Sequence, residues 1–218
     1  MKPYYEHNGI QIFHGDCREV LPELEPVDLV LTDPPYGIGF DYGDGGHDDD
    51  PECYEKLITT LVALTEKKAS GFMIWQSMKT CYLWHRWFPD GYRILAACKG
   101  MVQFRPTPIQ YSFDPVIAWG EFHSEPSVYN KDYHVQNKAP FGANRPKINH
   151  PCPRPFEQVR YFMNIAGGES VIDPFMGSGT TLVAAKQLHR KAIGIEISEK
   201  YCEIAAKRLG QEVLNLEI

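Results

Sequence analysis

The sequence predicts an α/β protein built on a doubly wound, mostly parallel sheet. Short apolar runs alternate with segments in which apolar residues recur at helical spacing along most of the 218 residues. Two of these runs end on an aspartate followed by proline, at Asp33 and at Asp173. Residues 169–197 give a third indication, because an apolar run, a glycine-rich turn, a helical stretch and another apolar run follow one another. That order is typical of the βαβ unit from which parallel sheets are assembled.

The first half of the chain contributes most of the predicted strands. Strands are expected at residues 10–13, 27–32, 72–75, 92–98 and 116–119. Helices are expected at residues 17–24, 51–64 and 80–88, with Asp50 as N-cap and Pro51 at the first helical position of the second one. Residues 37–49 are rich in glycine and aspartate and are expected to form a loop. The four tryptophans are assigned to the core: Trp75, Trp84, Trp87 and Trp119.

The second half is dominated by the βαβ unit. A helix is expected at residues 155–166, ended by two consecutive glycines. The unit itself comprises a strand at residues 169–172, a helix at 182–188 and a strand at 192–197. Ser198 is then expected to cap the last helix.

The first candidate site is the Asp-Pro-Pro-Tyr sequence at residues 33–36, directly after an apolar run. Its two prolines remove two backbone donors and fix φ, so the chain must turn sharply. The Asp33 carboxylate and the Pro34 carbonyl are then left as acceptors beside an aromatic ring, which suits an exocyclic amine on a planar heterocycle. The alternative is a proline-rich loop whose tyrosine packs on its own turn. The candidate catalytic residues are Asp33, Pro34, Pro35 and Tyr36.

The second candidate site is the glycine-rich turn at residues 173–179. Glycines let a ligand approach the backbone closely, and Glu196, at the end of the next strand, can accept both hydroxyls of a ribose. A dinucleotide fingerprint fails because Leu182 occupies the third glycine position, and no Gly-Lys-Ser/Thr follows for a P-loop. The pattern therefore favours a nucleoside without a pyrophosphate. A turn that serves only helix packing is the alternative.

Together the two motifs resemble those of the S-adenosylmethionine-dependent DNA amino-methyltransferases. In that family Asp-Pro-Pro-Tyr is the catalytic motif and Phe-x-Gly-x-Gly the cofactor motif; the catalytic motif comes first here, which is similar to the β-group order. The resemblance implies a Rossmann-like S-adenosylmethionine-dependent methyltransferase fold with circularly permuted motif order. It also implies S-adenosyl-L-methionine as cofactor, DNA as partner and methylation of N6 of a flipped adenine. N4-cytosine methylation and a catalytically silent nucleic-acid-binding module are the alternatives.

Two further segments carry the resemblance. Residues 14–17 are similar to the family's early Gly-Asp-Cys segment, whose aspartate, here Asp16, faces the cofactor adenine. Residues 149–155 resemble a His-Pro segment that lines the methionine end, although Cys152, Pro153 and Arg154 replace the usual Thr, Gln and Lys. Arg154 still provides a cation for the methionine carboxylate, but its planar guanidinium has a different geometry from the lysine ammonium group. The candidate cofactor-binding residues are Asp16, Asp33, His150, Arg154, Asp173, Phe175, Gly177, Ser178, Gly179, Thr180 and Glu196.

Composition is consistent with a single enzyme domain over residues 1–218. A hydrophobic content of 43% supports a sizeable core, and the sequence has no apolar run long enough to cross a membrane and no signal peptide. The six cysteines form no Cys-x-x-Cys pair, so we expect reduced thiols in the cytoplasm and no metal site. The missing second cysteine after Cys152 also excludes the zinc-dependent base deaminases.

The formal net charge of −6 argues against a DNA enzyme, since phosphates call for a basic surface. Its distribution partly answers the objection, because residues 131–160 hold six lysines and arginines against two acids. Lys138, Arg145 and Lys147 are the candidate DNA-binding residues, and a solvated charged loop is the alternative. By resemblance, residues 100–149 are expected to be a short inserted target-recognition segment. Its shortness suggests a homodimer.

Overall fold

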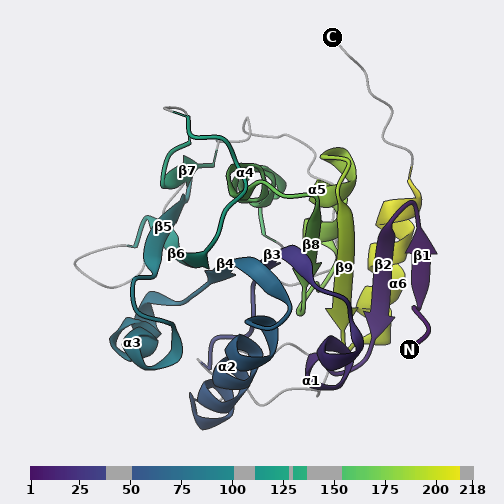
Figure 1. The fold of residues 1–218 in the computed structure, drawn as a ribbon, viewed down its shortest axis with the longest axis horizontal. Coiled ribbons are helices and arrows are strands. Elements are labelled where there is room, and N and C mark those ends of the chain that lie inside the picture. The colour runs from purple at the N-terminus through teal and green to yellow at the C-terminus, as the bar shows by residue number, and fades with distance from the viewer. Residues whose placement is uncertain (38–50, 101–110, 128–129, 137–153, 212–218) are drawn as a thin grey trace.

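A computed structural model describes residues 1–37, 51–100, 111–127, 130–136 and 154–211. In this part of the chain the strands form one nine-stranded sheet in the order β1-β2-β9-β8-β3-β4-β6-β5-β7 (Figure 1). The strands are β1 (Tyr5–His7), β2 (Ile10–His14), β3 (Val27–Thr32), β4 (Ala69–Trp75), β5 (Arg93–Cys98), β6 (Phe113–Gly120), β7 (Tyr133–Val135), β8 (Ser170–Asp173) and β9 (Lys191–Glu196).

The centre of the sheet is parallel. Strands β2, β9, β8, β3 and β4 run in one direction, whereas β6 is antiparallel to both of its neighbours, β4 and β5. Strand β1 pairs antiparallel with β2 at one edge, and β7 pairs parallel with β5 at the other. The sheet is therefore mostly parallel, as the sequence predicts.

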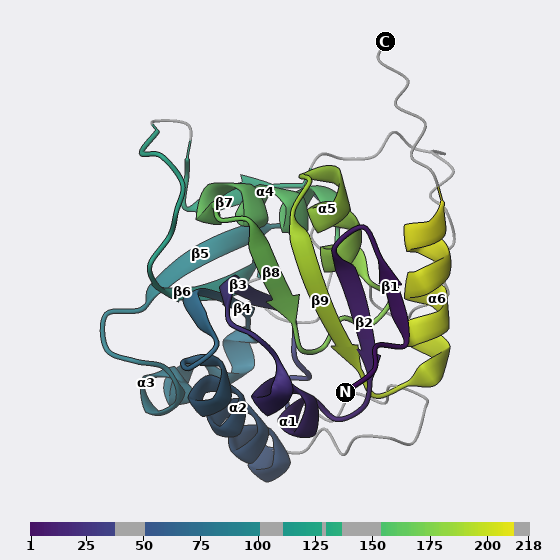
Figure 2. The same cartoon turned by 45° about the vertical axis from the view of Figure 1, so that its right-hand side comes forward.

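Helices cover both faces of the sheet (Figures 1 and 2). They are α1 (Cys17–Val20), α2 (Pro51–Thr65), α3 (Trp84–Trp87), α4 (Phe156–Ala166), α5 (Thr180–Gln187) and α6 (Glu199–Gly210), with 3-10 turns η1 (Leu21–Glu23) and η2 (Met78–Leu83). Alternate residues of β3 show the two layers: Leu29 and Leu31 pack with α4 and α5, whereas Val30 packs with α1 and α2. All four tryptophans are buried, as predicted. No described helix is long and apolar enough to cross a membrane.

Two predicted helices differ from those observed. The helix expected at 17–24 is α-helical only to Val20, because Pro22 has no N–H to donate to the carbonyl four residues earlier. The helix expected at 80–88 is a 3-10 turn to Leu83 and then the short α3. It ends at Trp87 because Phe88 precedes a proline and is therefore extended. The two prolines account for both endings.

The segment expected to be an inserted recognition module, residues 100–149, also supplies part of the sheet. Strand β6 from this segment lies between β4 and β5, and Val116, Ile117 and Ala118 are all buried. Strand β7, which the sequence does not predict, comes from the same segment. The described part of residues 100–149 thus contributes two strands to the sheet and is not only an inserted segment.

The connections define a switch point between β3 and β8, which are neighbours in the sheet. From β8 the chain passes through α5 to β9 on one side, whereas from β3 it passes through α2 to β4 on the other. In open α/β sheets such a reversal leaves a crevice outside the carboxyl ends of the two strands, where ligands bind. Both sequence motifs begin at this point, at Asp33 and Asp173.

Candidate active site

The Asp-Pro-Pro-Tyr turn follows β3 directly and folds its tyrosine back onto its aspartate. The Tyr36 hydroxyl donates to Asp33 Oδ1, and Pro34 is buried. Burial raises the pKa of Tyr36 well above its usual value, and the Asp33 carboxylate adds to this effect against the opposing charge of Arg154. The hydroxyl therefore stays protonated and acts as a donor to the carboxylate.

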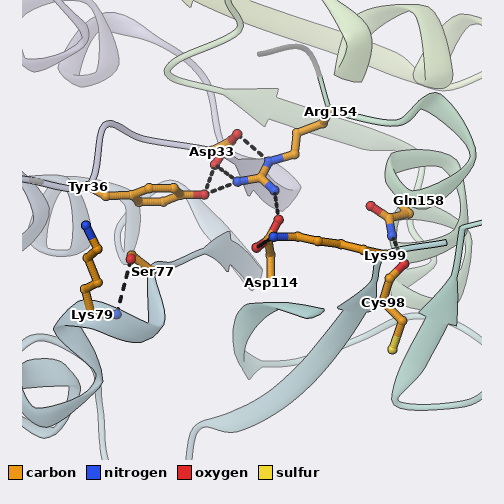
Figure 3. A network of polar contacts seen from close by, with 9 residues as sticks. All are labelled: Asp33, Tyr36, Ser77, Lys79, Cys98, Lys99, Asp114, Arg154 and Gln158. Carbon is orange, nitrogen blue, oxygen red and sulfur yellow. Dashed lines mark hydrogen bonds and ion pairs between the residues drawn. The ribbon is translucent and has the colours of Figure 1, made fainter. Parts of the chain in front are cut away.

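Arg154 lies between Asp33 and a second carboxylate, Asp114 (Figure 3). Its Nε donates to Asp33 Oδ2 at 2.5 Å and its Nη2 to Asp33 Oδ1 at 2.9 Å, while Nη1 donates to Asp114 Oδ2 at 2.6 Å. Nη2 also contacts the Tyr36 hydroxyl, and Lys99 Nζ lies 2.8 Å from Asp114 Oδ1. Burial lowers the pKa of Arg154, but Asp33, Tyr36 and Asp114 together outweigh this effect, and the pKa is raised well above the usual value.

This arrangement differs from the role expected for Arg154. The sequence predicts a contact with the cofactor's methionine carboxylate, whereas the structure pairs the guanidinium with two carboxylates of the chain itself. The cofactor contact stays a prediction. His150, Lys138, Arg145 and Lys147 lie outside the described residues.

Asp173, at the end of β8, accepts hydrogen bonds from other residues of the chain and links β8 to β3 at the switch point. Thr32 Oγ1 donates to Asp173 Oδ1 at 2.6 Å, and the Phe175 backbone N–H donates to the same oxygen at 3.1 Å. The residue is only 3% exposed, and burial raises the pKa of Asp173 to about 6 against the hydrogen bonds from Thr181 and Thr32. Its carboxylate therefore shapes the turn and fixes β8 to β3.

The glycine-rich turn after Asp173 has a backbone that needs its glycines. Gly177 and Gly179 have φ angles of 51° and 79°, in the left-handed region. A Cβ on Gly179 would also lie 2.7 Å from Cβ of Ala205 on α6. The turn is thus packed closely against α6 at Gly179.

Arg208, on α6, supports the same turn from behind. Its Nη1 contacts the Ser178 carbonyl, and it lies 3.2 Å from Ser178 Oγ and 3.4 Å from Thr180 Oγ1. The side chains of Ser178 and Thr180 are buried. Both residues, predicted to bind the cofactor, thus contact Arg208 on α6, and their cofactor contact stays a prediction.

Glu196, at the end of β9, contacts both the glycine-rich turn after β8 and the residues that follow β2. Its Oε2 accepts from the Gly177 N–H at 3.0 Å and its Oε1 from the Ser198 N–H at 2.8 Å. On the other side, the Gly15 N–H donates to the Glu196 carbonyl at 3.0 Å, next to Asp16. The Asp16 carboxylate caps α1 and pairs with Arg18. Asp16, Glu196 and Gly177 thus lie at or just after the carboxyl ends of three adjacent strands, β2, β9 and β8.

Sequence reasoning missed Asp114 and Lys99. Neither belongs to a motif, and Asp114 lies near the start of its strand, where a parallel strand would put it at the opposite edge of the sheet. Because β6 is antiparallel to β4, its first residues lie beside the carboxyl ends of the parallel strands. Only the direction of β6 could have revealed the cluster.

Comparison with known proteins agrees with this geometry. Residues 117–207 match the DNA methylase family of N6- and N4-methyltransferases. The chain is 26% identical to the type II methyltransferase M.ScaI of Streptomyces caespitosus over 99% of this chain and 86% of that protein. It is 24% identical to the type II methyltransferase M2.DpnII of Streptococcus pneumoniae over 97% of this chain and 93% of that protein.

Solved structures share the fold. The cytosine-N4-specific PvuII DNA methyltransferase superimposes with a TM-score of 0.74 at 17% identity, covering 99% of this chain and 90% of that one. The M1.HpyAVI complex with S-adenosylmethionine gives a TM-score of 0.66 at 21% identity, covering 92% of this chain and 100% of that one. The sequence matches confirm the predicted family resemblance, and the structural matches confirm the predicted fold.

Proposed function

We propose that this chain, a relative of the S-adenosylmethionine-dependent DNA amino-methyltransferases, methylates N6 of an adenine flipped out of duplex DNA. The observation that carries the proposal is the joining of the two motifs at one switch point, through the 2.6 Å hydrogen bond from Thr32 to Asp173. That bond sets the start of the catalytic turn beside the start of the cofactor turn. A transferase needs its two substrates side by side in this way.

S-adenosylmethionine is the cofactor in this proposal. The chain's own residues fit it: the turn at Gly177 has a backbone without a side chain, and the Glu196 carboxylate lies against that turn. Glu196 would hold the ribose and Asp16 the adenine end. The cofactor supplies an electrophilic methyl group, so the protein's part is to bind, orient and exclude water.

The Asp-Pro-Pro-Tyr turn would bind the target amine. A base inside a duplex is out of reach of a crevice at a sheet edge, so the adenine is flipped out and stacks on Tyr36. The Asp33 carboxylate and the Pro34 carbonyl each accept a hydrogen bond from the target amine. These two hydrogen bonds draw the nitrogen lone pair out of conjugation with the ring. Pro35 keeps the turn rigid and offers no competing donor. Positioning supplies most of the rate, and Asp33 is not required as a strong base.

Adenine is favoured over cytosine by the aspartate at the first position of the motif, since by resemblance serine is more usual for cytosine N4. N4 methylation is the second candidate, because the relatives include a cytosine-N4-specific enzyme. We further propose that Lys138, Arg145 and Lys147 contact phosphates and that residues 100–149 take part in target recognition.

One experiment tests the proposal. The protein is incubated with methyl-labelled cofactor and DNA from a methyltransferase-deficient strain, and the DNA is then digested to nucleosides. Label in N6-methyldeoxyadenosine is expected. Label in N4-methyldeoxycytidine would show that the target base is cytosine, and the proposed methyl transfer would still hold. Absence of label, with the cofactor bound, would favour the silent module instead.

A further inference from the structure

The charged cluster beside the catalytic turn has a member that no motif assigns, Asp114. Strand β6 begins at the edge where the parallel strands end, so the Asp114 side chain lies beside the turn that follows β3. Pairing fixes its place: Asp114 is opposite Ala97 of β5, and the Gln76 N–H after β4 donates to the Pro115 carbonyl at 2.9 Å. The backbone at Asp114 and Pro115 is therefore fixed by β5 on one side and by the residue that follows β4 on the other.

Arg154 is held on several sides. Asp33 takes two of its nitrogens and Asp114 a third, and its Cζ lies 5.9 Å from the ring centre of Tyr36 and 5.7 Å from that of Trp75. Its side chain is 15% exposed, so it has little room to move. Lys99 balances the second carboxylate, and the cluster contains two acids and two cations. Removing either the acid or the cation of such a partly buried pair destabilises the protein, because the remaining charge is left poorly solvated and without its partner.

The cluster also determines how Asp33 is presented. Each carboxylate oxygen can accept two hydrogen bonds. Oδ1 of Asp33 accepts from Tyr36 and from Arg154 Nη2, whereas Oδ2 accepts only from Arg154 Nε among the described residues. Within the described part of the chain, one acceptor position of Oδ2 is thus left for a further donor. Because this contact uses two nitrogens and two oxygens, the guanidinium orients the Asp33 carboxylate, and Asp114 holds the guanidinium through its third nitrogen.

We propose that Asp114 is a positioning residue for methyl transfer. It holds Arg154 in place, with Lys99 as its counter-charge, so that Arg154 orients the Asp33 carboxylate and leaves one Oδ2 acceptor position for the target amine. The inference rests on the proposed function of the catalytic turn. It assigns Arg154 to the catalytic carboxylate, a role distinct from its predicted contact with the cofactor.

A double-mutant cycle on the transfer rate tests this role. Single-turnover methylation of DNA from a methyltransferase-deficient strain is measured at saturating cofactor for D114N, R154M and the double variant. Each single change is expected to lower the rate by about tenfold or more, because small misplacements of a reacting group have effects of this size. The double variant should be no slower than R154M, since Asp114 acts through Arg154. Asp114→Glu should recover part of the loss.

Cofactor affinity separates positioning from binding. Calorimetric titration with S-adenosylmethionine should give a dissociation constant for D114N within about twofold of wild type, while the rate falls. The matched control is Glu203→Gln, which removes one carboxylate from an exposed ion pair with Lys207 on α6. This control should leave both quantities unchanged.

A measurement that does not depend on enzyme activity distinguishes the role of Asp114 from the proposed function. In ¹⁵N-arginine-labelled protein, the Nε–H resonance of Arg154, assigned as the one lost in R154K, should exchange slowly with water in wild type and faster in D114N. Additive rate losses in the cycle, unchanged exchange in D114N, or a transfer rate unaffected by D114N would each overturn the role of Asp114. No transfer by wild type would overturn the proposed function as well. If R154M does not fold, R154K replaces it in the cycle.

Discussion

At the scale of single residues, two aspartates at neighbouring strand ends have opposite environments. Asp33 is 28% exposed at its side chain and accepts hydrogen bonds from the Arg154 guanidinium and the Tyr36 hydroxyl, whereas Asp173 is buried and accepts from hydroxyl and amide donors. The first can present an acceptor to a ligand. The second holds β8 to β3 through Thr32, and its contact with the cofactor stays a prediction.

Replacing Asp33 with alanine should abolish methyl transfer while cofactor binding survives within a few-fold. The variant removes the amine acceptor and leaves the glycine-rich turn intact. Loss of a preorganised hydrogen bond of this kind costs about a hundred- to a thousandfold in rate. Single-turnover assays and calorimetry on the same preparation measure the two quantities. Wild-type turnover in the variant would contradict the mechanism.

Asp173 should make the protein less stable as pH rises from 4 to 7. Its pKa of about 6 in the folded state exceeds the ordinary 3.8, so the folded protein binds a proton that the unfolded chain releases. The stabilising contribution is full below pH 4 and is lost as pH rises through 6. Relative to Asp173→Asn, the wild type should lose about 3 kcal/mol of unfolding free energy over this range, since each pKa unit is worth about 1.4.

Urea unfolding of both proteins at several pH values measures this difference. A constant gap between the two curves would mean that the carboxyl titrates alike in the folded and unfolded chains. The asparagine can still accept from the Phe175 N–H, so the variant keeps this contact while it removes the titrating group.

At the scale of elements, the sequence predicts the central strands well because each is a continuous apolar run. It fails for β1 and β7, which are three residues long and half exposed, too short for any periodicity. The turn residues 33–36 and 173–179 are predicted by their unusual composition. Asp114 is not, because its role depends on the direction of β6, which local sequence does not encode.

The turn between β8 and α5 carries the third prediction. Gly177→Val should weaken S-adenosylmethionine binding by about tenfold or more, because a branched residue at a φ of 51° strains the backbone that the ligand must approach. Glu196→Ala should weaken it too, by removing the acceptor beside that backbone. Calorimetric titration measures both.

Gly91 offers a matched control for backbone strain. Its φ is 84°, and a Cβ there would meet nothing within 4 Å, so Gly91→Ala adds strain without a clash. This variant should lose some stability and keep full cofactor affinity. Unchanged affinity in both Gly177→Val and Glu196→Ala would mean that the cofactor binds elsewhere.

At the scale of the whole molecule, an acidic chain must still bind a polyanion. The net charge is −6, so the phosphate contacts must be concentrated locally. If Lys138, Arg145 and Lys147 make them, replacing all three with alanine should weaken DNA binding and flatten its dependence on salt. The logarithmic slope should fall by about one unit for each lost contact. Fluorescence anisotropy over a salt series measures it, and an unchanged slope would assign the three residues to solvated surface.

The last prediction is that the working unit is a homodimer. Flipping a base costs a few kcal/mol, and an acidic chain whose proposed recognition segment has about fifty residues, some of them in the sheet, has few contacts with which to offset it. A second copy would supply more contacts without a longer chain. Exposed aromatic surface is consistent with such a contact: Tyr82 on η2 is 68% exposed, while Trp84 and Trp87 of the following helix are buried.

Sedimentation velocity at micromolar concentration, with and without DNA, decides between one copy and two. We expect a dimer at least in the presence of DNA, and Tyr82→Glu should shift it toward monomer if η2 lies in the contact. The same substitution should leave single-turnover methylation intact at protein concentrations that restore the dimer, because Tyr82 lies outside both site motifs. A monomer under both conditions that methylates duplex DNA at full rate would show that one acidic chain makes all the contacts that flipping needs.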